Sequence, residues 1–286
     1  MTDSGFDILY EDNHLISVVK PSGVLSQSDG SGGPDMLTLL SADIARRYGK
    51  PGKAFIGLIH RLDRNVGGVM FFAKTSKGAS RASEDMRSGL FYKGYFALTG
   101  RKIDGPGEGL LRDRLKKDER LNRVFQADDG RDCVLYYKYI CEISKTGGGE
   151  SGRDNVRTSG KTGGRFLYFA VPVTGRSHQI RVQFALHGAP LAGDNKYGPV
   201  FDDAGLRASA EKVEQAGADI GLWSAIASVR KTTDRSERIW VSALPKAEKW
   251  LLPDGSFPPK AADFIDAGST RELLERLKGE AFDETV

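Results

Sequence analysis

The sequence predicts an α+β fold: a single domain built around a large mixed, mostly antiparallel sheet with flanking helices. Strand-like runs outnumber helical ones along the 286 residues, and neither an internal repeat nor an interdomain linker interrupts them. The chain is 39% hydrophobic and 28% charged, which is ordinary for a globular protein. We therefore expect one domain over residues 1–286, long enough to bury a substantial core.

The N-terminal part alternates strands with helices. Residues 8–20 predict two strands separated by a turn at 11–13, and the second strand stops at Pro21. Residues 36–48 carry apolar side chains at steps of three and four, which form one face of a helix. The apolar run 69–73 predicts a buried strand, and the polar segment 76–87 predicts a helix directly after it.

Strands dominate the remainder of the chain. Segments rich in β-branched and aromatic residues predict strands at 92–100, 133–143, 165–173, 221–229 and 238–244. Residues 147–164, rich in Gly, Ser, Arg and Lys, predict a long flexible hairpin loop. Residues 258–286 predict a helical tail, in which Ser269 or Thr270 is placed to cap the apolar positions that follow.

Composition and motif spacing exclude several classes of function. No stretch approaches the roughly 18 uninterrupted apolar residues of a membrane span, and the N-terminus lacks a signal-peptide pattern, so we expect a cytoplasmic chain without a membrane partner. The four histidines show no metal-ligand spacing, and no complete phosphate-binding or dinucleotide motif is present. We expect neither a metal nor a cofactor. The net charge of +4 gives weak support for a polyanionic partner.

One charged loop is a candidate for chemistry. Residues 57–68 place Asp63 among His60, Arg61 and Arg64, between an apolar run and a pair of glycines. Flanking cations favour the ionised form of a carboxylate, so such a loop can hold an active carboxylate. The simpler interpretation is a capped turn with surface arginines.

Two further segments indicate a function only when they are considered together with the charged loop. In residues 173–188, Ser177 is placed to cap a helix, and Arg181 lies one residue from the apolar face of that helix, within reach of a buried carboxylate. In residues 93–100, Tyr95 shares a strand face with Ala97, where it can line a cleft and stack on a nucleobase. Alone, each fits an ordinary helix flank or plain sheet packing.

Together these segments resemble the RluA-type pseudouridine synthase family. The landmarks occur in the family's order and span about residues 8–245, so chance agreement is improbable. They are Lys20-Pro21-Ser22-Gly23, His60-Arg61-Leu62-Asp63, Phe72-Ala73-Lys74, Lys93-Gly94-Tyr95, the run from Thr174 through Arg176, His178 and Gln179 to Arg181, and Gly193 to Gly198.

The resemblance implies a pseudouridine synthase fold with a central active-site cleft and an enzyme that isomerises uridine in rRNA or tRNA without a cofactor. It implies that Asp63 is the essential carboxylate, Arg181 its ion-pair partner and Tyr95 the aromatic group against the target base. Arg61 would enter the RNA as the uridine flips out. Asp63 would attack C1′ or abstract the 2′ proton, and the sequence leaves both routes open. The further candidates for RNA or substrate contact are His60, Arg64, Arg176, His178 and Gln179.

The chain departs from the family pattern at two places, which indicates an atypical branch. Val66 and Gly67 stand where the family usually has Thr and Ser, and Leu222-Trp223-Ser224 replaces the usual Leu-His-Ala.

The landmarks begin almost at the N-terminus, so we expect no separate N-terminal RNA-binding domain and RNA contact by the catalytic domain itself. Residues 112–117 with Arg120 and Arg123 are a candidate contact, and a solvated mixed-charge face is an equal alternative. We expect a monomer without an obligate protein partner.

Two other functions remain open from the sequence. The first is a catalytically silent RNA-binding or RNA-folding protein on the same scaffold, suggested by the change at Val66 and Gly67. The second is a hydrolase that uses Asp63 and His178 as an acid and base pair.

Overall fold

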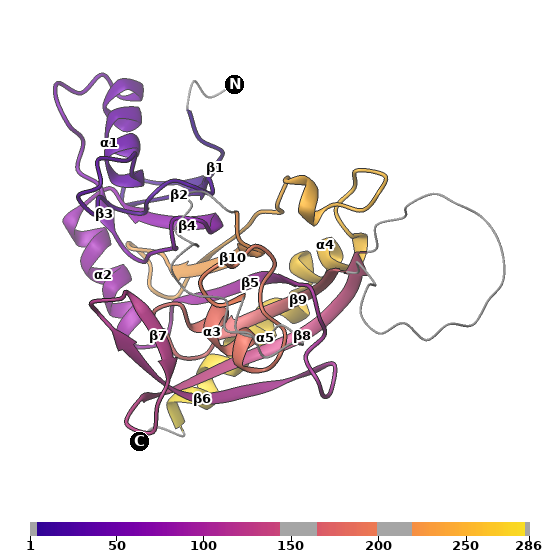
Figure 1. Ribbon diagram of the computed structural model, residues 1–286. Helices are drawn as coiled ribbons and strands as arrows, with labels where there is room; N and C mark the ends of the chain where they lie inside the picture. Colours follow the sequence, from indigo (N-terminus) through magenta and orange to yellow (C-terminus); the bar gives the residue numbers. More distant parts are fainter. Residues whose placement is uncertain (1–4, 144–164, 199–218, 284–286) are drawn as a thin grey trace, which may run out of the picture.

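In the computed structural model, which describes residues 5–143, 165–198 and 219–283, the strands form one 11-stranded sheet (Figure 1). Neighbouring strands are antiparallel except β4 and β10, which confirms the predicted mixed, mostly antiparallel sheet. The main path runs through β1 (Ile8–Glu11), β2 (Leu15–Lys20), β4 (Gly67–Ala73), β10 (Leu222–Arg230), β5 (Tyr92–Thr99), β9 (Arg165–Pro172), β8 (Arg131–Ile143), β6 (Glu108–Asp118) and β7 (Arg123–Gln126).

Along the main strand order, the shortest pairing between two neighbouring strands is that of β4 with β10. Only Gly67 and Gly68 pair with Trp223 and Ser224 in parallel register. Beyond this point β3 (Gly57–Leu58) continues along β4, while β11 (Arg238–Ser242) continues along β10. The loop 59–66, which joins β3 to β4, therefore crosses the junction between the two halves of the sheet.

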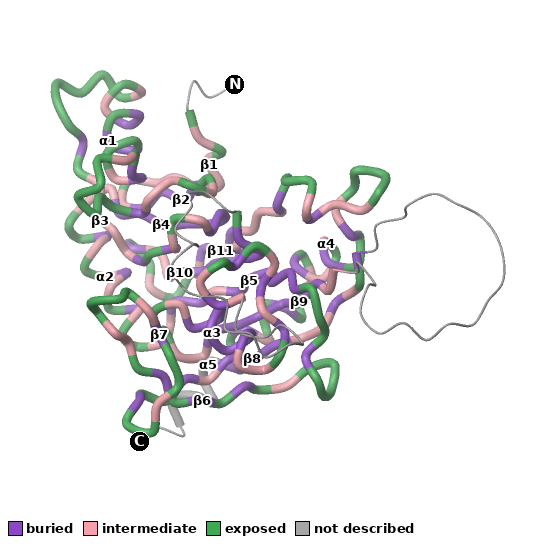
Figure 2. The backbone as a smooth tube through the Cα atoms, viewed as in Figure 1, coloured by how far each residue is buried: buried purple, intermediate pink, exposed green. Residues whose placement is uncertain are grey.

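Strand alternation divides the core between the two faces. Met70 and Phe72 of β4 belong to one hydrophobic cluster with Tyr95 of β5, and Phe71 and Phe96 point to clusters on the other face. Figure 2 shows the buried backbone concentrated in the central strands. The first face is covered by α1 (Met36–Arg47) and α3 (Gln179–Leu186), and the second by α2 (Ser76–Arg87), α4 (Pro259–Asp266) and α5 (Gly268–Asp283).

The C-terminal tail is helical as predicted, but its predicted capping is wrong. The tail contains two helices, and α5 begins at Gly268, so Ser269 and Thr270 lie inside its first turn. The Thr270 hydroxyl donates to the Phe264 carbonyl of the preceding helix instead. The predicted hairpin loop 147–164 lies outside the described residues. Across the described chain, no helix combines the length and apolarity needed to cross a bilayer.

Candidate active site

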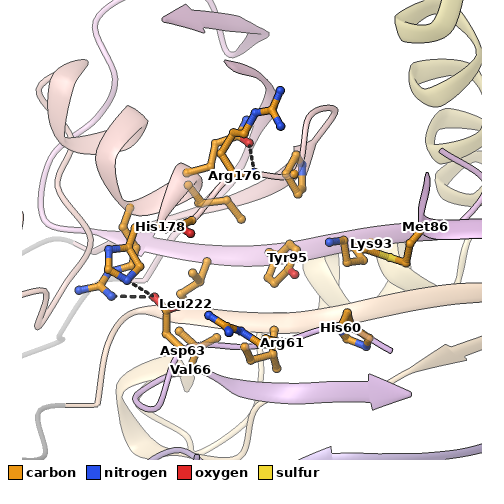
Figure 3. Close-up of a pocket in the computed structure, with 17 residues that line it drawn as sticks. His60, Arg61, Asp63, Val66, Met86, Lys93, Tyr95, Arg176, His178 and Leu222 are labelled. Carbon is orange, nitrogen blue, oxygen red and sulfur yellow. Dashed lines mark hydrogen bonds and ion pairs between the residues drawn. The ribbon is translucent and has the colours of Figure 1, made fainter. Parts of the chain in front are cut away.

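A pocket of about 300 Å³ lies at the junction of the two sheet halves (Figure 3). We call it the Asp63 pocket. Its walls come from the loop 59–66, from β5, from residues 175–178 and from α3, so segments far apart in sequence meet here. Of the nine side chains singled out from the sequence, eight line it: His60, Arg61, Asp63, Tyr95, Arg176, His178, Gln179 and Arg181. Arg64 is absent from this lining, and its exposed side chain donates from Nε to the Gly23 carbonyl at 3.1 Å.

Asp63 presents one carboxylate oxygen to two groups of the pocket. A turn fixes its backbone, since the Val66 N–H donates to the Asp63 carbonyl at 3.0 Å. Oδ2 accepts a hydrogen bond from Arg181 Nη1 at 2.7 Å and lies 3.8 Å from His178 Nε2. Burial acts to raise the pKa of Asp63, but the His178 ring and the Arg181 guanidinium outweigh it and hold that pKa below its usual value. Asp63 is therefore ionised at neutral pH.

Arg181 is shared between two carboxylates. The side chain is only 8% exposed, and while Nη1 faces Asp63, Nε and Nη2 donate to the two oxygens of Asp194 at 2.7 and 2.9 Å. Burial works against the charge, but Asp194 and Asp63 raise the pKa of Arg181 above its ordinary value. Asp194 is fully buried and also accepts the backbone N–H groups of Lys196 and Tyr197.

No role for Asp194 follows from the sequence, although the run Gly193 to Gly198 matches a landmark of the family. An aspartate between two glycine turns has no spacing that relates it to Arg181. The signal present in the sequence was the arginine itself, because a buried guanidinium has more donors than one carboxylate accepts.

His178 adopts a left-handed backbone, with φ of 52°, which costs a non-glycine residue roughly 1–2 kcal/mol. The imidazole ring of His178 is held in place by a hydrogen bond to Tyr197. The Tyr197 hydroxyl lies 2.6 Å from His178 Nδ1 and accepts the Val124 N–H at 3.0 Å. We assign the Tyr197 hydroxyl as the donor in its hydrogen bond to Nδ1. The proton of the neutral imidazole then lies on Nε2, which faces Asp63. Burial lowers the pKa of His178 below its usual value.

The predicted capping of α3 by Ser177 is wrong. The helix begins after His178, without a side-chain cap, and Ser177 is exposed. Gln179 organises this turn instead, since its Oε1 accepts the Arg176 N–H at 3.1 Å and the Thr174 hydroxyl at 3.0 Å. Its Nε2 donates to two further protein acceptors, so the amide group of Gln179 is fully engaged within the protein.

Tyr95 forms the middle of the pocket wall. It is 6% exposed and lies between Asp63 and Lys93 (Figure 3), and burial together with Asp63 raises the pKa of its hydroxyl above the usual value. Arg61 and Arg176 line the same pocket but are exposed, so both are accessible to a large ligand.

Lys20 ties the Asp63 loop to the start of the chain. Its side chain is fully buried, and Nζ donates to the carbonyls of Pro21, Val24 and Arg64 at 2.9, 2.6 and 3.1 Å. Burial lowers the pKa of Lys20 to about 8. One ammonium thus fixes the loop 59–66 against residues 21–24.

The two departures from the family pattern meet in the structure. Gly67 and Trp223 pair across the β4–β10 junction, and a Cβ at position 67 would lie 2.6 Å from Trp223 Cζ3. The indole occupies the space that a serine side chain would need. At the next position, Gly68 has φ of +116° and a Cβ there would lie 2.2 Å from the Ser224 carbonyl oxygen, so only glycine fits.

The basic segment 112–117 forms part of β6, a strand that sequence analysis did not predict. Exposed and inward positions alternate along it, and its exposed cations lie near acidic side chains. Examples are Lys116 with Asp129 and Arg114 with Asp132. This arrangement favours the solvated mixed-charge face over a dedicated RNA contact.

The chain is similar in sequence and in structure to known proteins. The family model described as RNA pseudouridylate synthase matches residues 14–186. Ribosomal large subunit pseudouridine synthase C of Rickettsia prowazekii is 32% identical over 67% of this chain and 56% of its own length. Ribosomal large subunit pseudouridine synthase D of Xanthomonas campestris is 31% identical over 68% of this chain and 53% of its own. The chain thus spans little more than half the length of these relatives.

Two solved structures share the fold. Human RNA Pseudouridylate Synthase Domain Containing 1 has a TM-score of 0.63 at 16% identity, covering 96% of this chain and 95% of that one. Human RNA Pseudouridylate Synthase Domain Containing 4 has a TM-score of 0.58 at 20% identity, covering 84% and 88%. The matched family model extends over more than half of the chain and includes Asp63, Tyr95 and Arg181, so this chain belongs to the RNA pseudouridylate synthase family, of the RluA type.

Proposed function

We propose that this protein isomerises uridine to pseudouridine in RNA, with ribosomal RNA as the substrate class that its relatives' names favour. The observation that carries the proposal is the meeting of Asp63, Arg181 and Tyr95 in one pocket, with Asp63 ionised by its surroundings. The reaction breaks the N1–C1′ bond, turns the uracil and rejoins it through C5. The C5 proton is lost and N1 gains one, so the mass is unchanged.

In this proposal Asp63 acts on the sugar, as a nucleophile at C1′ or as a base at C2′. Arg181 keeps the carboxylate oriented and ionised, and Tyr95 packs against the base. The exposed Arg61 enters the RNA where the uridine has left the stack, and Arg64 and Arg176 contact the backbone. The volume of about 300 Å³ suits one extruded nucleoside.

The geometry argues against a hydrolase in which His178 is the general base and Asp63 the acid. In the hydrogen-bond assignment above, Nδ1 accepts the Tyr197 proton and Nε2 already carries one. Neither ring nitrogen is then free to take a proton from water.

The test uses RNA labelled with tritium at C5 of uridine, prepared from cells that lack the protein. We expect the purified protein to release tritium to water, and we expect unlabelled RNA treated in the same way to keep its mass. Asp63→Asn should abolish release and retain the fold, because amide and carboxylate are nearly isosteric. Asp104→Asn, at an exposed aspartate, is the matched control.

Appreciable tritium release by Asp63→Asn would contradict the catalytic assignment. Intact RNA binding without tritium release by the wild type would favour the silent RNA-binding protein. Release of free base or sugar would establish hydrolysis.

A further inference from the structure

The Asp63 pocket has a second end that the proposed mechanism does not use. Lys93 lies two residues before Tyr95 on β5, so both side chains emerge on the same face, roughly 7 Å apart along the strand. Figure 3 shows Asp63 and His178 toward one end of the pocket, Tyr95 in the middle, and Lys93, His60 and Met86 toward the other end.

Lys93 brings an uncompensated ammonium group to this end. Among the described residues it has no hydrogen bond and no acidic partner, and burial lowers its pKa to about 8. It therefore remains mostly protonated at neutral pH. An ammonium has three donors and no acceptor, and leaving them unpaired in a partly dry pocket is costly.

His60 adds a second unpaired donor. Its ring is 5% exposed, and Nε2 accepts the Phe71 N–H at 3.0 Å, so the proton of the neutral ring is on Nδ1. Nδ1 has no partner among the described residues. Burial, reinforced by the charge of Lys93, lowers the pKa of His60 to about 3 and keeps the ring neutral. Nδ1 is closed to solvent in this structure, so an acceptor on the ligand reaches it only after a small movement of the pocket wall.

The ligand at this end must therefore offer acceptors only. In a uridine nucleotide the groups that only accept hydrogen bonds are the phosphate oxygens, the ring oxygen of the sugar, and the two carbonyl oxygens of the uracil. The sugar must lie beside Asp63, and the phosphates are attached to the sugar, so they stay at that end. The base extends from C1′ across Tyr95, which carries its carbonyl edge toward Lys93.

We propose that Lys93 and His60 form a carbonyl-binding subsite, which recognises a carbonyl oxygen of the target uracil and stabilises the negative charge that this oxygen gains when the N1–C1′ bond breaks. The inference rests on the proposed function. When the N1–C1′ bond breaks, the uracil keeps the bonding electron pair on N1 and becomes negatively charged. This negative charge spreads onto O2 and O4 whether Asp63 acts as nucleophile or base. Cytosine carries an amino donor at C4 in place of O4, so a subsite built for O4 also rejects cytidine.

The experiment pairs enzyme variants with substrate atoms. A short RNA containing the uridine at which the wild type releases tritium is made in three forms: with uracil, with 2-thiouracil and with 4-thiouracil at the target. Sulfur is a weaker acceptor than oxygen, so each thio form weakens one contact. Single-turnover rates and RNA affinities are measured for the wild type, Lys93→Met, Lys93→Arg and the control Lys138→Met, at a lysine of β8 that lies outside the pocket lining and whose side chain is 38% exposed.

We expect Lys93→Met to slow the uracil form roughly 100-fold while RNA affinity changes far less, and Lys93→Arg to recover part of the rate. One thio form should slow the wild type roughly tenfold but leave Lys93→Met no slower than it already is. The form that shows this coupling identifies O2 or O4. A purely structural role for Lys93 would not produce such coupling.

Wild-type rate in Lys93→Met, or equal slowing of the wild type and Lys93→Met by both thio forms, would overturn the inference and leave the proposed function standing. If circular dichroism shows that Lys93→Met does not fold, the wild type and Lys93→Arg still test the contact. The contact is excluded if neither thio form changes the single-turnover rate of either protein. Absence of tritium release by the wild type would refute the proposed function instead.

Discussion

The contact between Gly67 and Trp223 makes a sharp prediction about how this chain departs from its family. Gly67→Ser restores the residue that the family usually has, yet it should destabilise this protein. A Cβ at position 67 would lie 2.6 Å from Cζ3 and 3.0 Å from Cε3 of Trp223. The indole has little freedom to move away, because its Nε1 donates to the Ala243 carbonyl at 2.7 Å. Overpacking of this kind costs about 1–3 kcal/mol in the free energy of unfolding.

The same geometry predicts that the two departures depend on each other. Trp223→His alone should also destabilise, because it leaves space beside Gly67. The double variant should lose at least about 1 kcal/mol less than the sum of the single losses, since the smaller ring accommodates the serine. Urea unfolding of all four proteins measures this coupling. Gly100→Ser is the control, because a Cβ at Gly100 meets nothing within 4 Å. Additive losses, or a Gly67→Ser cost no larger than that of Gly100→Ser, would refute the reasoning.

Two further predictions concern buried charge. Arg181→Met should lower the free energy of unfolding by about 3–5 kcal/mol and abolish tritium release, because it leaves the fully buried Asp194 without its cation; unchanged denaturant stability would contradict this. His60 has a folded-state pKa of about 3, below its ordinary 6.5, so the unfolded chain binds the proton first as the pH falls. This group alone should cost about 2 kcal/mol of stability at pH 5. His60→Gln can still accept the Phe71 N–H and should be less sensitive to pH between 7 and 5, and a parallel pH dependence would count against a neutral buried ring.

Much of the fold was predictable because runs and alternations of apolar residues indicate which strand positions are buried. The run 69–73 is buried throughout in β4, and the predicted alternation around Tyr95 matches β5, where Tyr95 and Ala97 belong to one hydrophobic cluster and Phe96 to another. Strand β6 escaped prediction for a physical reason. Its exposed positions other than Leu110 carry charges, and one of its inward positions is Asp113, so the segment resembles a run of charged residues. Two interactions with other segments stabilise it as a strand. It pairs with β8, and the buried side chain of Gln183 donates to Asp113 and to the Leu111 carbonyl. Neither partner can be identified from the local sequence of β6.

The site was predictable in part for a related reason. The residue types around Asp63 indicated a carboxylate among cations, and Arg181 reaches Asp63, a pairing that the family resemblance implied and local sequence alone did not. The partners that fix these side chains come from elsewhere in the chain: Asp194, Tyr197 and the buried Lys20. No local spacing connects them with position 63, because only the tertiary fold brings them together.

The sharing of Arg181 has a consequence for turnover under the proposed function. Both chemical routes remove the charge of Asp63 for part of the cycle, either by forming an ester or by taking a proton. An arginine paired with Asp63 alone would then be a buried, uncompensated cation, and its orientation would be lost. Here Asp194 engages two of the guanidinium nitrogens and leaves Nη1 for Asp63. The guanidinium therefore stays neutralised and in place while Asp63 reacts, and it is ready to stabilise the carboxylate again when the product forms.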